Sequence, residues 1–222
     1  MSTRGADRNA LLIFARAPVA GEAKTRLIPA LGAAGAARLQ QRLTEHALAT
    51  AARTQIGSVQ LWCTPSPTHP FFVDCARRYP IAVRTQSGLT LGERLAFAAV
   101  RELPGRDAIV IIGTDCPVLT DLHLRAALDA LQESDAVIYP AEDGGYVLLG
   151  LACQCPEVFS GIDWGSKRVF DQTMQNLSGA GRRVSVRETL WDVDTPADFE
   201  RLARCMPGWA DVAVQPHANL GR

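Results

Sequence analysis

Asp115 stands where a carboxylate could do chemistry, directly after the apolar run "IVII" and the pair "GT". A short apolar run of this kind is typical of a strand buried on both faces. Open α/β sheets bind ligands at the carboxyl ends of their parallel strands, which favours a ligand site at Asp115. Aspartate also starts turns and caps helices, so this residue alone leaves both interpretations open.

A second pair of acids, Asp192 and Asp194, lies in the stretch "WDVDTPADF". Side chains two residues apart point to the same side of an extended chain, so these two carboxylates could act together. The residues that follow predict a helix, with Thr195 as its cap and Asp198 completing a capping box. Because aspartate before Thr-Pro is also a common helix start, a purely structural role remains an alternative.

A third acidic position, Asp143, lies in "AEDGGYVLLGL" between two apolar stretches. Two glycines beside an acid are typical of a hairpin turn. They also allow a backbone to approach a ligand closely, and a carboxylate there could orient or deprotonate a hydroxyl group.

The loop "RAPVAGEAKTRLIPALG" follows the first predicted strand and carries three cations with a glycine among them. Cationic side chains and backbone N–H groups suit a polyphosphate, although a solvated basic loop has the same composition. The loop is not a P-loop, because Pro18 and Ala23 stand where that motif needs glycine. The chain also lacks the GxGxxG pattern of dinucleotide-binding folds.

The composition narrows the class of protein. The 222 residues include 23 Lys plus Arg and 23 Asp plus Glu, so the chain lacks the basic excess of a non-specific nucleic-acid binder. The apolar runs are too short to span a bilayer and the N-terminus does not resemble a signal peptide, so we expect a cytoplasmic protein. Six scattered cysteines without a CxxC pair are expected to be free thiols, and four dispersed histidines argue against a zinc site.

Apolar and helical stretches alternate along the chain, which predicts an α/β fold with a mostly parallel central sheet and helices on both faces. The close pair of strands around residue 143 predicts an antiparallel excursion near one edge. We expect one domain over residues 9–206, with flexible ends at 1–8 and 207–222. Strands are predicted over 10–17, 58–63, 81–86, 108–112, 135–140, 146–151 and 182–188, and helices over 32–53, 70–79, 91–103, 121–132, 166–177 and 195–206.

Four separated stretches resemble one known family in order and in spacing. They are "FARAPVAGEAKTRLIPALG", "IIGTDCPVL", "DGGYVLLGL" and "DVDTPADF", and the resemblance covers residues 10 to about 203. The family is DUF2064, also described as the radical-SAM/selenodomain-associated transferase 1 family and as glycosyltransferase-like. It belongs to the nucleotide-diphospho-sugar transferase superfamily, which also holds nucleotidyltransferases such as the molybdenum-cofactor and phospholactate guanylyltransferases. The implied fold is a three-layer α/β/α sandwich of GT-A type.

The resemblance also implies a metal site and a phosphate site. Asp115 would hold Mg²⁺ or Mn²⁺ against the phosphates, with Asp194 or Asp192 as the second acid, because "TDC" supplies one carboxylate where many glycosyltransferases have DxD. Lys24 would be catalytic together with Asp115 and Asp143. The residues expected to contact the nucleotide and its phosphates are Arg16, Gly21, Lys24, Thr25, Arg26, Gln86, Gly88 and Arg94.

The acceptor side is implied by the stretch around residue 143 and by "FSGIDWGSKRVF". We expect the acceptor to contact Asp143, Gly144, Gly145, Tyr146 and Trp164. The family usually has Ser-Thr after this tryptophan, whereas this chain has Gly165 and Ser166.

The expected function is metal-dependent transfer from a nucleotide-activated donor to a small-molecule acceptor, with a nucleotide-sugar glycosyltransferase as the leading interpretation. A guanylyltransferase-like nucleotidyltransferase, which joins a nucleoside triphosphate to a phosphorylated acceptor and releases pyrophosphate, is the alternative. A nucleotide-binding module without turnover is the second alternative. Neither nucleic acid nor membrane is an expected partner, and the sequence leaves the oligomeric state open.

Overall fold

The computed structural model describes residues 8–212. The flexible ends expected at 1–8 and 207–222 therefore lie mostly outside the described residues. The described part of the second end, Pro207–Val212, forms a 3₁₀ helix. Its Trp209 is 6% exposed and packs in a core cluster, so this part of the end is ordered against the domain.

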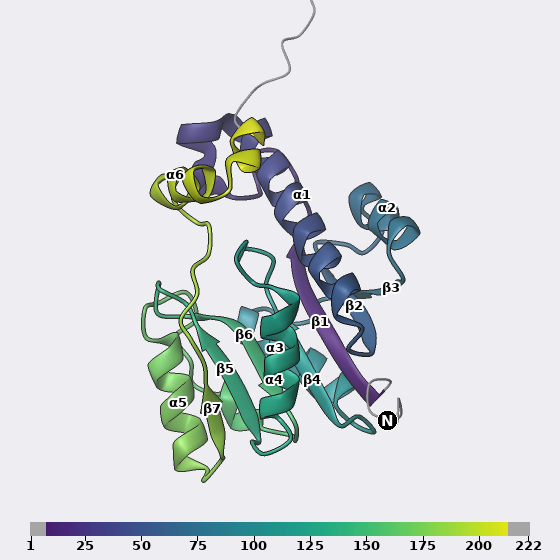
Figure 1. Cartoon of the computed structure of the whole chain (residues 1–222), viewed down its shortest axis with the longest axis vertical. Helices are drawn as coiled ribbons and strands as arrows, with labels where there is room; N and C mark the ends of the chain where they lie inside the picture. Colours follow the sequence, from purple (N-terminus) through teal and green to yellow (C-terminus); the bar gives the residue numbers. More distant parts are fainter. Residues whose placement is uncertain (1–7, 213–222) are drawn as a thin grey trace, which may run out of the picture.

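A seven-stranded sheet forms the centre of the molecule, in the order β3-β2-β1-β4-β6-β5-β7 (Figure 1). All neighbouring strands pair in parallel except β6, which is antiparallel to both β4 and β5. The mostly parallel sheet and the antiparallel excursion are thus confirmed. The strands are β1 (Asn9–Arg16), β2 (Ser58–Thr64), β3 (Ile81–Thr85), β4 (Ala108–Ile112), β5 (Ala136–Pro140), β6 (Tyr146–Leu151) and β7 (Val184–Val186).

Helices cover both faces of this sheet, because alternate strand residues are apolar on each side. In β1, Leu11 and Ile13 pack in a core with α1, α2 and α4, whereas Leu12 and Phe14 pack in a core with α3 and α5. The expected three-layer α/β/α sandwich is confirmed. The helices are α1 (Ile28–Thr54), α2 (Pro70–Arg78), α3 (Leu91–Glu102), α4 (Asp121–Ala130), α5 (Val169–Gly179) and α6 (Pro196–Cys205), with 3₁₀ helices at Thr25–Leu27 and Pro156–Phe159.

A third, smaller core lies beyond the edge of the sheet. Figure 1 shows α6 beside the beginning of α1, above the sheet in that view. Leu31 and Leu39 from α1, Phe199 and Leu202 from α6, and Val193 from the segment before α6 are buried together there. The capping box of α6 forms as predicted, with Thr195 accepting from the Asp198 N–H and the Asp198 side chain accepting from the Thr195 N–H.

Three loops meet at one edge of the sheet. β1 and β4 are parallel neighbours, so the loops after Arg16 and Ile112 leave the sheet at the same edge. Because β6 is antiparallel to β4 and pairs Leu148 with Ile112, its beginning at Tyr146 lies at this edge as well. The predicted functional residues lie mainly on these loops.

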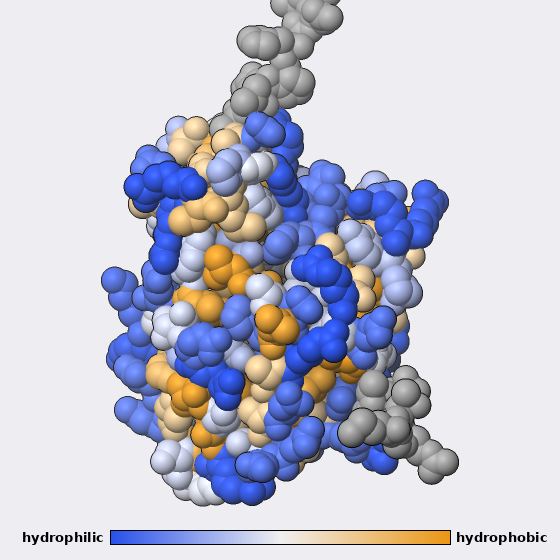
Figure 2. Space-filling view, in the orientation of Figure 1, coloured by the Kyte–Doolittle hydropathy of each residue, from blue (hydrophilic) through white to orange (hydrophobic). Residues whose placement is uncertain are grey.

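Hydrophilic side chains predominate on the face shown in Figure 2, and apolar residues appear there in small patches. Among residues 8–212, none of the helices combines the length and apolar character that crossing a bilayer requires.

Candidate active site at the carboxyl edge of the sheet

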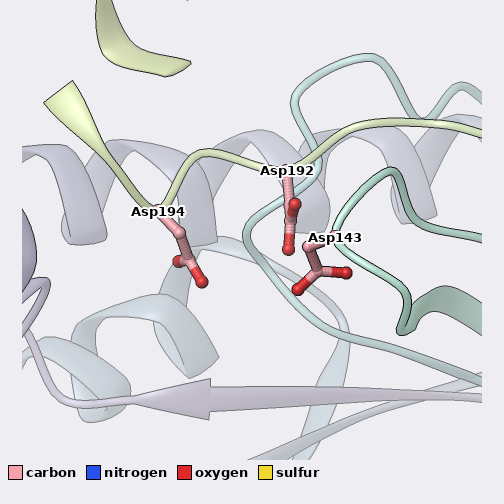
Figure 3. A group of neighbouring side chains, drawn as sticks. All are labelled: Asp143, Asp192 and Asp194. Atoms are coloured by element: carbon pink, nitrogen blue, oxygen red, sulfur yellow. The ribbon is translucent and has the colours of Figure 1, made fainter. Parts of the chain in front are cut away.

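Three carboxylates converge at this edge (Figure 3). Asp143 lies on the turn between β5 and β6, and Asp192 and Asp194 lie on the segment that leads to α6. One oxygen from each of the three lies within 4.8 Å of the others, which is a spacing that a metal ion could bridge. The expectation had paired Asp192 and Asp194 with Asp115, whereas the described residues form this three-acid group with Asp143.

The segment with Asp192 and Asp194 is held by the two loops beside it. Leu190 donates its N–H to the Pro140 carbonyl and accepts from Glu142, which forms a parallel bridge with the end of β5. Val193 donates its N–H to the Asp115 carbonyl at 2.9 Å. These backbone hydrogen bonds hold the acidic segment between the turn after β5 and the loop after β4, although the segment is not itself a strand.

The pKa of Asp192 is raised to about 7. Partial burial is the largest cause, because it penalises the charged form, and the negative charges of Asp143, Asp194 and Asp115 add to it. A cation placed among these acids would relieve the repulsion.

Lys24 supplies a positive charge to the same group of acids. Its ammonium lies 2.9 Å from Oδ2 of Asp115 and 2.9 Å from Oδ1 of Asp194, and it donates to the Val193 carbonyl at 2.6 Å. The side chain is only 5% exposed. Burial lowers the pKa of Lys24, but the two carboxylates together raise it above its ordinary value. The predicted phosphate ligand is therefore an acid-bound lysine in this structure.

Asp115 is oriented by a chain of buried polar side chains. Thr114 donates its hydroxyl to Oδ1 of Asp115 at 3.2 Å, and Gln40 from α1 donates its side-chain amide to the Thr114 hydroxyl at 3.1 Å. Gln40 is 4% exposed and Thr114 is 5% exposed. Sequence reasoning missed both residues as positioning groups, although Gln40 is a polar residue within one turn of Leu39 and Leu43 on the buried face of its helix.

Burial raises the pKa of the neighbouring Cys116 thiol to about 12, which disfavours the thiolate that a nucleophile needs. All six cysteines, which lie within the described residues, are free thiols as predicted.

Four further residues predicted to contact the nucleotide are exposed at the end of β1 and on the loop after it: Arg16, Gly21, Thr25 and Arg26. The Arg26 side chain is 73% exposed, and its guanidinium lies 3.8 Å from Oδ2 of Asp194. Lys24 itself has a left-handed backbone with φ of 49°, which turns the loop inward before the Thr25–Leu27 helix.

The segment after β3 is tied to the strand ends by a glutamine. Gln86 donates its side-chain amide to the carbonyls of Ala15 and Trp62, at 3.2 and 2.9 Å. Gly88 has φ of +136°, and a Cβ there would lie 2.7 Å from the Cβ of Glu93. Arg94 donates to the Gly88 carbonyl at 2.9 Å. These contacts fix the loop, and the nucleotide role expected for it stays a prediction.

The turn that carries Asp143 requires glycine at one position. Gly144 has φ of +92°, and an added Cβ would lie 2.2 Å from the Lys167 carbonyl oxygen. Gly145 donates its N–H to Oδ1 of Asp143 at 2.8 Å, which holds the carboxylate over the turn. The Gly144 carbonyl accepts from the Phe170 N–H, so the turn is also joined to the beginning of α5.

Tyr146 and Trp164 lie together beside this turn. Their rings meet edge to face with centroids 6.2 Å apart. Burial raises the pKa of the Tyr146 phenol well above its usual range, so the phenol is not a base near neutral pH. Both rings line a pocket that Asp143 and Asp192 also border. The structure therefore brings the expected acceptor residues together.

Comparison with known families matches residues 47–166 to DUF2064, described as "Uncharacterized protein conserved in bacteria". This match spans more than half of the chain. The chain belongs to this family. The DUF2064 match includes Asp115, Asp143 and Trp164, whereas Lys24 and the acidic segment before α6 lie outside the matched residues.

Solved structures support the same relationship. A Desulfovibrio desulfuricans G20 protein, provisionally named a nucleotide-diphospho-sugar transferase, is 31% identical with a TM-score of 0.82; the match covers 90% of this chain and 87% of that one. The 4-diphosphocytidyl-2C-methyl-D-erythritol synthase of Anaerococcus prevotii DSM 20548 is 12% identical with a TM-score of 0.63, and the match covers 91% and 99%. A Mycobacterium tuberculosis H37Rv protein in complex with manganese is 17% identical with a TM-score of 0.53, covering 89% and 98%.

The two more distant structures show a shared fold, and the first supports the expected class of transferase. No protein with a curated description matched the chain. The DUF2064 assignment and the GT-A-type α/β/α fold expected from the sequence are confirmed.

Proposed function

We propose that this DUF2064 protein is a divalent-metal-dependent transferase that acts on a nucleotide-activated donor. The observation that carries the proposal is the group of four acids with one buried lysine at the carboxyl edge of the sheet. The stability of the fold does not require this group, because placing like charges close together in a partly buried site costs free energy. Groups of this kind are common at catalytic and ligand-binding sites.

The acids fit a hard divalent cation. Carboxylate oxygens are the ligands that Mg²⁺ and Mn²⁺ prefer, and Asp143, Asp192 and Asp194 already bring three of them together. Asp115 reaches the same region through its shared partner Lys24, and we retain it as a fourth ligand. Such a cation would stabilise the charge of the departing phosphate group. The manganese complex of the distant structural relative is compatible with this assignment.

The basic side chains beside the acids would bind the donor phosphates. The exposed Arg26 lies 3.8 Å from Asp194, and Arg16 is exposed at the end of β1, from where it would contact the same ligand. Lys24 would exchange a carboxylate for a phosphate oxygen when donor and cation are both bound, because the cation takes over its role of neutralising Asp115 and Asp194. Gly21 and Thr25 would offer backbone and hydroxyl groups to the same phosphates.

Asp143 would orient the acceptor hydroxyl or accept its proton. The Gly145 N–H holds the Asp143 carboxylate over the pocket that Tyr146 and Trp164 line. Burial keeps the Tyr146 phenol protonated, so the carboxylates of Asp143 and Asp192 are the groups bordering this pocket that could accept a proton from the acceptor.

We favour glycosyl transfer, because the relative at 31% identity is named for nucleotide-diphospho-sugar transfer. Nucleotidyl transfer remains the second candidate, because a solved relative with the same fold is named as a diphosphocytidyl compound synthase. Both reactions would use the same acids and cations and would differ in the bond that breaks.

Product analysis with labelled donors tests the proposal. The protein would be incubated with Mn²⁺ or Mg²⁺, pooled cell metabolites as acceptors, and either nucleotide-sugars or nucleoside triphosphates. Release of free nucleoside diphosphate identifies glycosyl transfer, and release of pyrophosphate identifies nucleotidyl transfer. If neither donor is consumed while nucleotide still raises the melting temperature, the protein is a binding module without turnover.

A further inference from the structure

A pocket of about 240 Å³ lies beside the acid cluster, on the face of the sheet covered by α3 and α5. Its floor is formed by strand residues that include Phe14, Ile111 and Leu149. Leu95 from α3 and Trp164 from the segment before α5 form its walls. This volume is about that of eight molecules in liquid water, so the pocket can hold a compact chemical group.

The charged residues that line this pocket are acidic. Asp143 and Asp192 border it, and none of the described residues that line it is a lysine, arginine or histidine. The cations next to lining residues along the chain are Lys167, which is exposed, and Arg94, whose Nε donates to the Gly88 carbonyl; the guanidinium of Arg168 is bound to Asp163. Lys24 is engaged by Asp115 and Asp194.

An anion would therefore be unfavourable inside the pocket. In the metal-free protein, a phosphate group among these walls would lose its hydration without gaining a cationic side chain of the lining, and the two carboxylates at the border would repel it. An uncharged group with an apolar face would instead bind favourably, because it would cover the aliphatic and aromatic side chains that line the pocket.

We infer that this pocket binds the acceptor through an uncharged, largely apolar part and rejects phosphorylated acceptors. The inference rests on the proposed function, because it assumes that Asp143 addresses an acceptor hydroxyl. It also deepens that function, because an acceptor with a free hydroxyl fits glycosyl transfer, whereas the nucleotidyltransferase alternative requires a phosphorylated acceptor.

Benzyl alcohol and benzyl phosphate are matched probes, because they share a ring and differ by the phosphate. Saturation-transfer NMR on the metal-free protein would measure both affinities, so that no bound cation attracts the benzyl phosphate. We expect benzyl alcohol to bind at least about tenfold more tightly, a difference of about 1.4 kcal/mol. Trp164→Ala should weaken benzyl alcohol binding, with folding checked by circular dichroism.

Ser166→Lys places a cation in the lining, because Ser166 is a half-buried pocket residue. This variant should bind benzyl phosphate at least as tightly as benzyl alcohol. Ser178→Lys, at an exposed position of α5 outside the pocket lining, should keep the wild-type preference.

Three outcomes would overturn the inference: equal or tighter binding of benzyl phosphate by the wild type, binding of neither probe, or the same response in both lysine variants. Thermal shifts with nucleotide and Mg²⁺ on the same samples report donor binding separately. If those shifts occur while the probe preference fails, the acceptor class is wrong and the proposed donor chemistry stands. If the shifts are absent, the proposed function itself fails.

Discussion

The Lys24 ammonium lies 2.9 Å from Oδ2 of Asp115, although one residue follows β1 and the other follows β4. The same nitrogen binds Asp194 from the segment before α6. One cation thus joins three separate parts of the chain at the edge of the sheet. Any divalent ion that enters this group must compete with Lys24 for the same oxygens.

Removing this competitor should strengthen metal binding. Lys24→Met leaves Asp115 and Asp194 without their ammonium, so we expect the nucleotide-free protein to bind Mn²⁺ about tenfold more tightly, as a gain of about 1.4 kcal/mol would produce. Isothermal titration with Mn²⁺ measures the change. Unchanged or weaker Mn²⁺ binding would mean that the metal does not use these carboxylates.

The same substitution should destabilise the metal-free fold. Lys24 is 5% exposed but Asp115 and Asp194 are 41% and 37% exposed, so removing the ammonium should cost about 2 kcal/mol, less than for a fully buried ion pair. Urea denaturation in EDTA at pH 8 measures this loss. Arg26→Met is the matched control, because Arg26 is 73% exposed and 3.8 Å from Asp194, so it should cost less than about 1 kcal/mol.

Asp192 should make the stability of the metal-free protein fall with pH. Its pKa is about 7 in the folded protein and near 4 in an unfolded chain, so the folded state binds the additional proton between these values. The free energy of unfolding therefore decreases as pH rises from about 4 to 7 and the loss is complete above 7.

Asp192→Asn should remove this pH dependence. At pH 8 in EDTA we expect the variant to be more stable than wild type by about 2 kcal/mol, which is below the full linkage value because Asp192 is partly exposed. Urea denaturation between pH 5 and 8 measures both slopes. Asp163→Asn, at an exposed acid outside the cluster, should retain the wild-type slope.

Asp143 should contribute directly to metal binding. Asp143→Asn replaces a carboxylate oxygen of the three-acid group with a neutral amide, so the rise in melting temperature caused by Mn²⁺ should be mostly lost. Glu142→Gln alters the adjacent exposed acid, which is bound to Arg201, and should keep the full response. Equal responses in the two variants would remove Asp143 from the metal site.

Substitution of Gly144 should cost more stability than substitution of Gly165, although both glycines have a positive φ. Gly144→Ala places a Cβ 2.2 Å from the Lys167 carbonyl, and we expect a loss of about 3 kcal/mol together with weaker Mn²⁺ binding. Gly165→Ala has a similar φ of +88° with nothing within 4 Å, so it should cost about 1 kcal/mol. Urea denaturation and Mn²⁺ titration of both variants separate contact from backbone strain.

The sheet could be predicted because its strands carry strong local signals. The apolar runs of β1 and β4 and the alternation in β2 depend on residues close in sequence. Element ends were less predictable. α5 begins at Val169 rather than 166, because Ser166 and Arg168 belong to the turn that binds Asp163.

The sequence could predict which acids belong to the site, but not which side chains bind one another there. The sequence places Asp115, Asp143 and Asp194 beside turns, and all three gather at one edge of the sheet. It contains no signal that Lys24 binds the acids, because the loop path that turns Lys24 inward depends on tertiary contacts. The buried amide of Gln40, which orients Thr114, likewise depends on how α1 lies over β4.

The small core beyond the sheet has a mechanical consequence. Leu27, just after Lys24, and Val193, between Asp192 and Asp194, are both fully buried in it with the beginning of α1 and with α6. The Lys24 loop and the segment with Asp192 and Asp194 are therefore both anchored in the same small core. A ligand that stabilises the Lys24 loop should therefore also stabilise α6 through this shared core. We expect amide hydrogen exchange in α6 to become slower when the ligand binds.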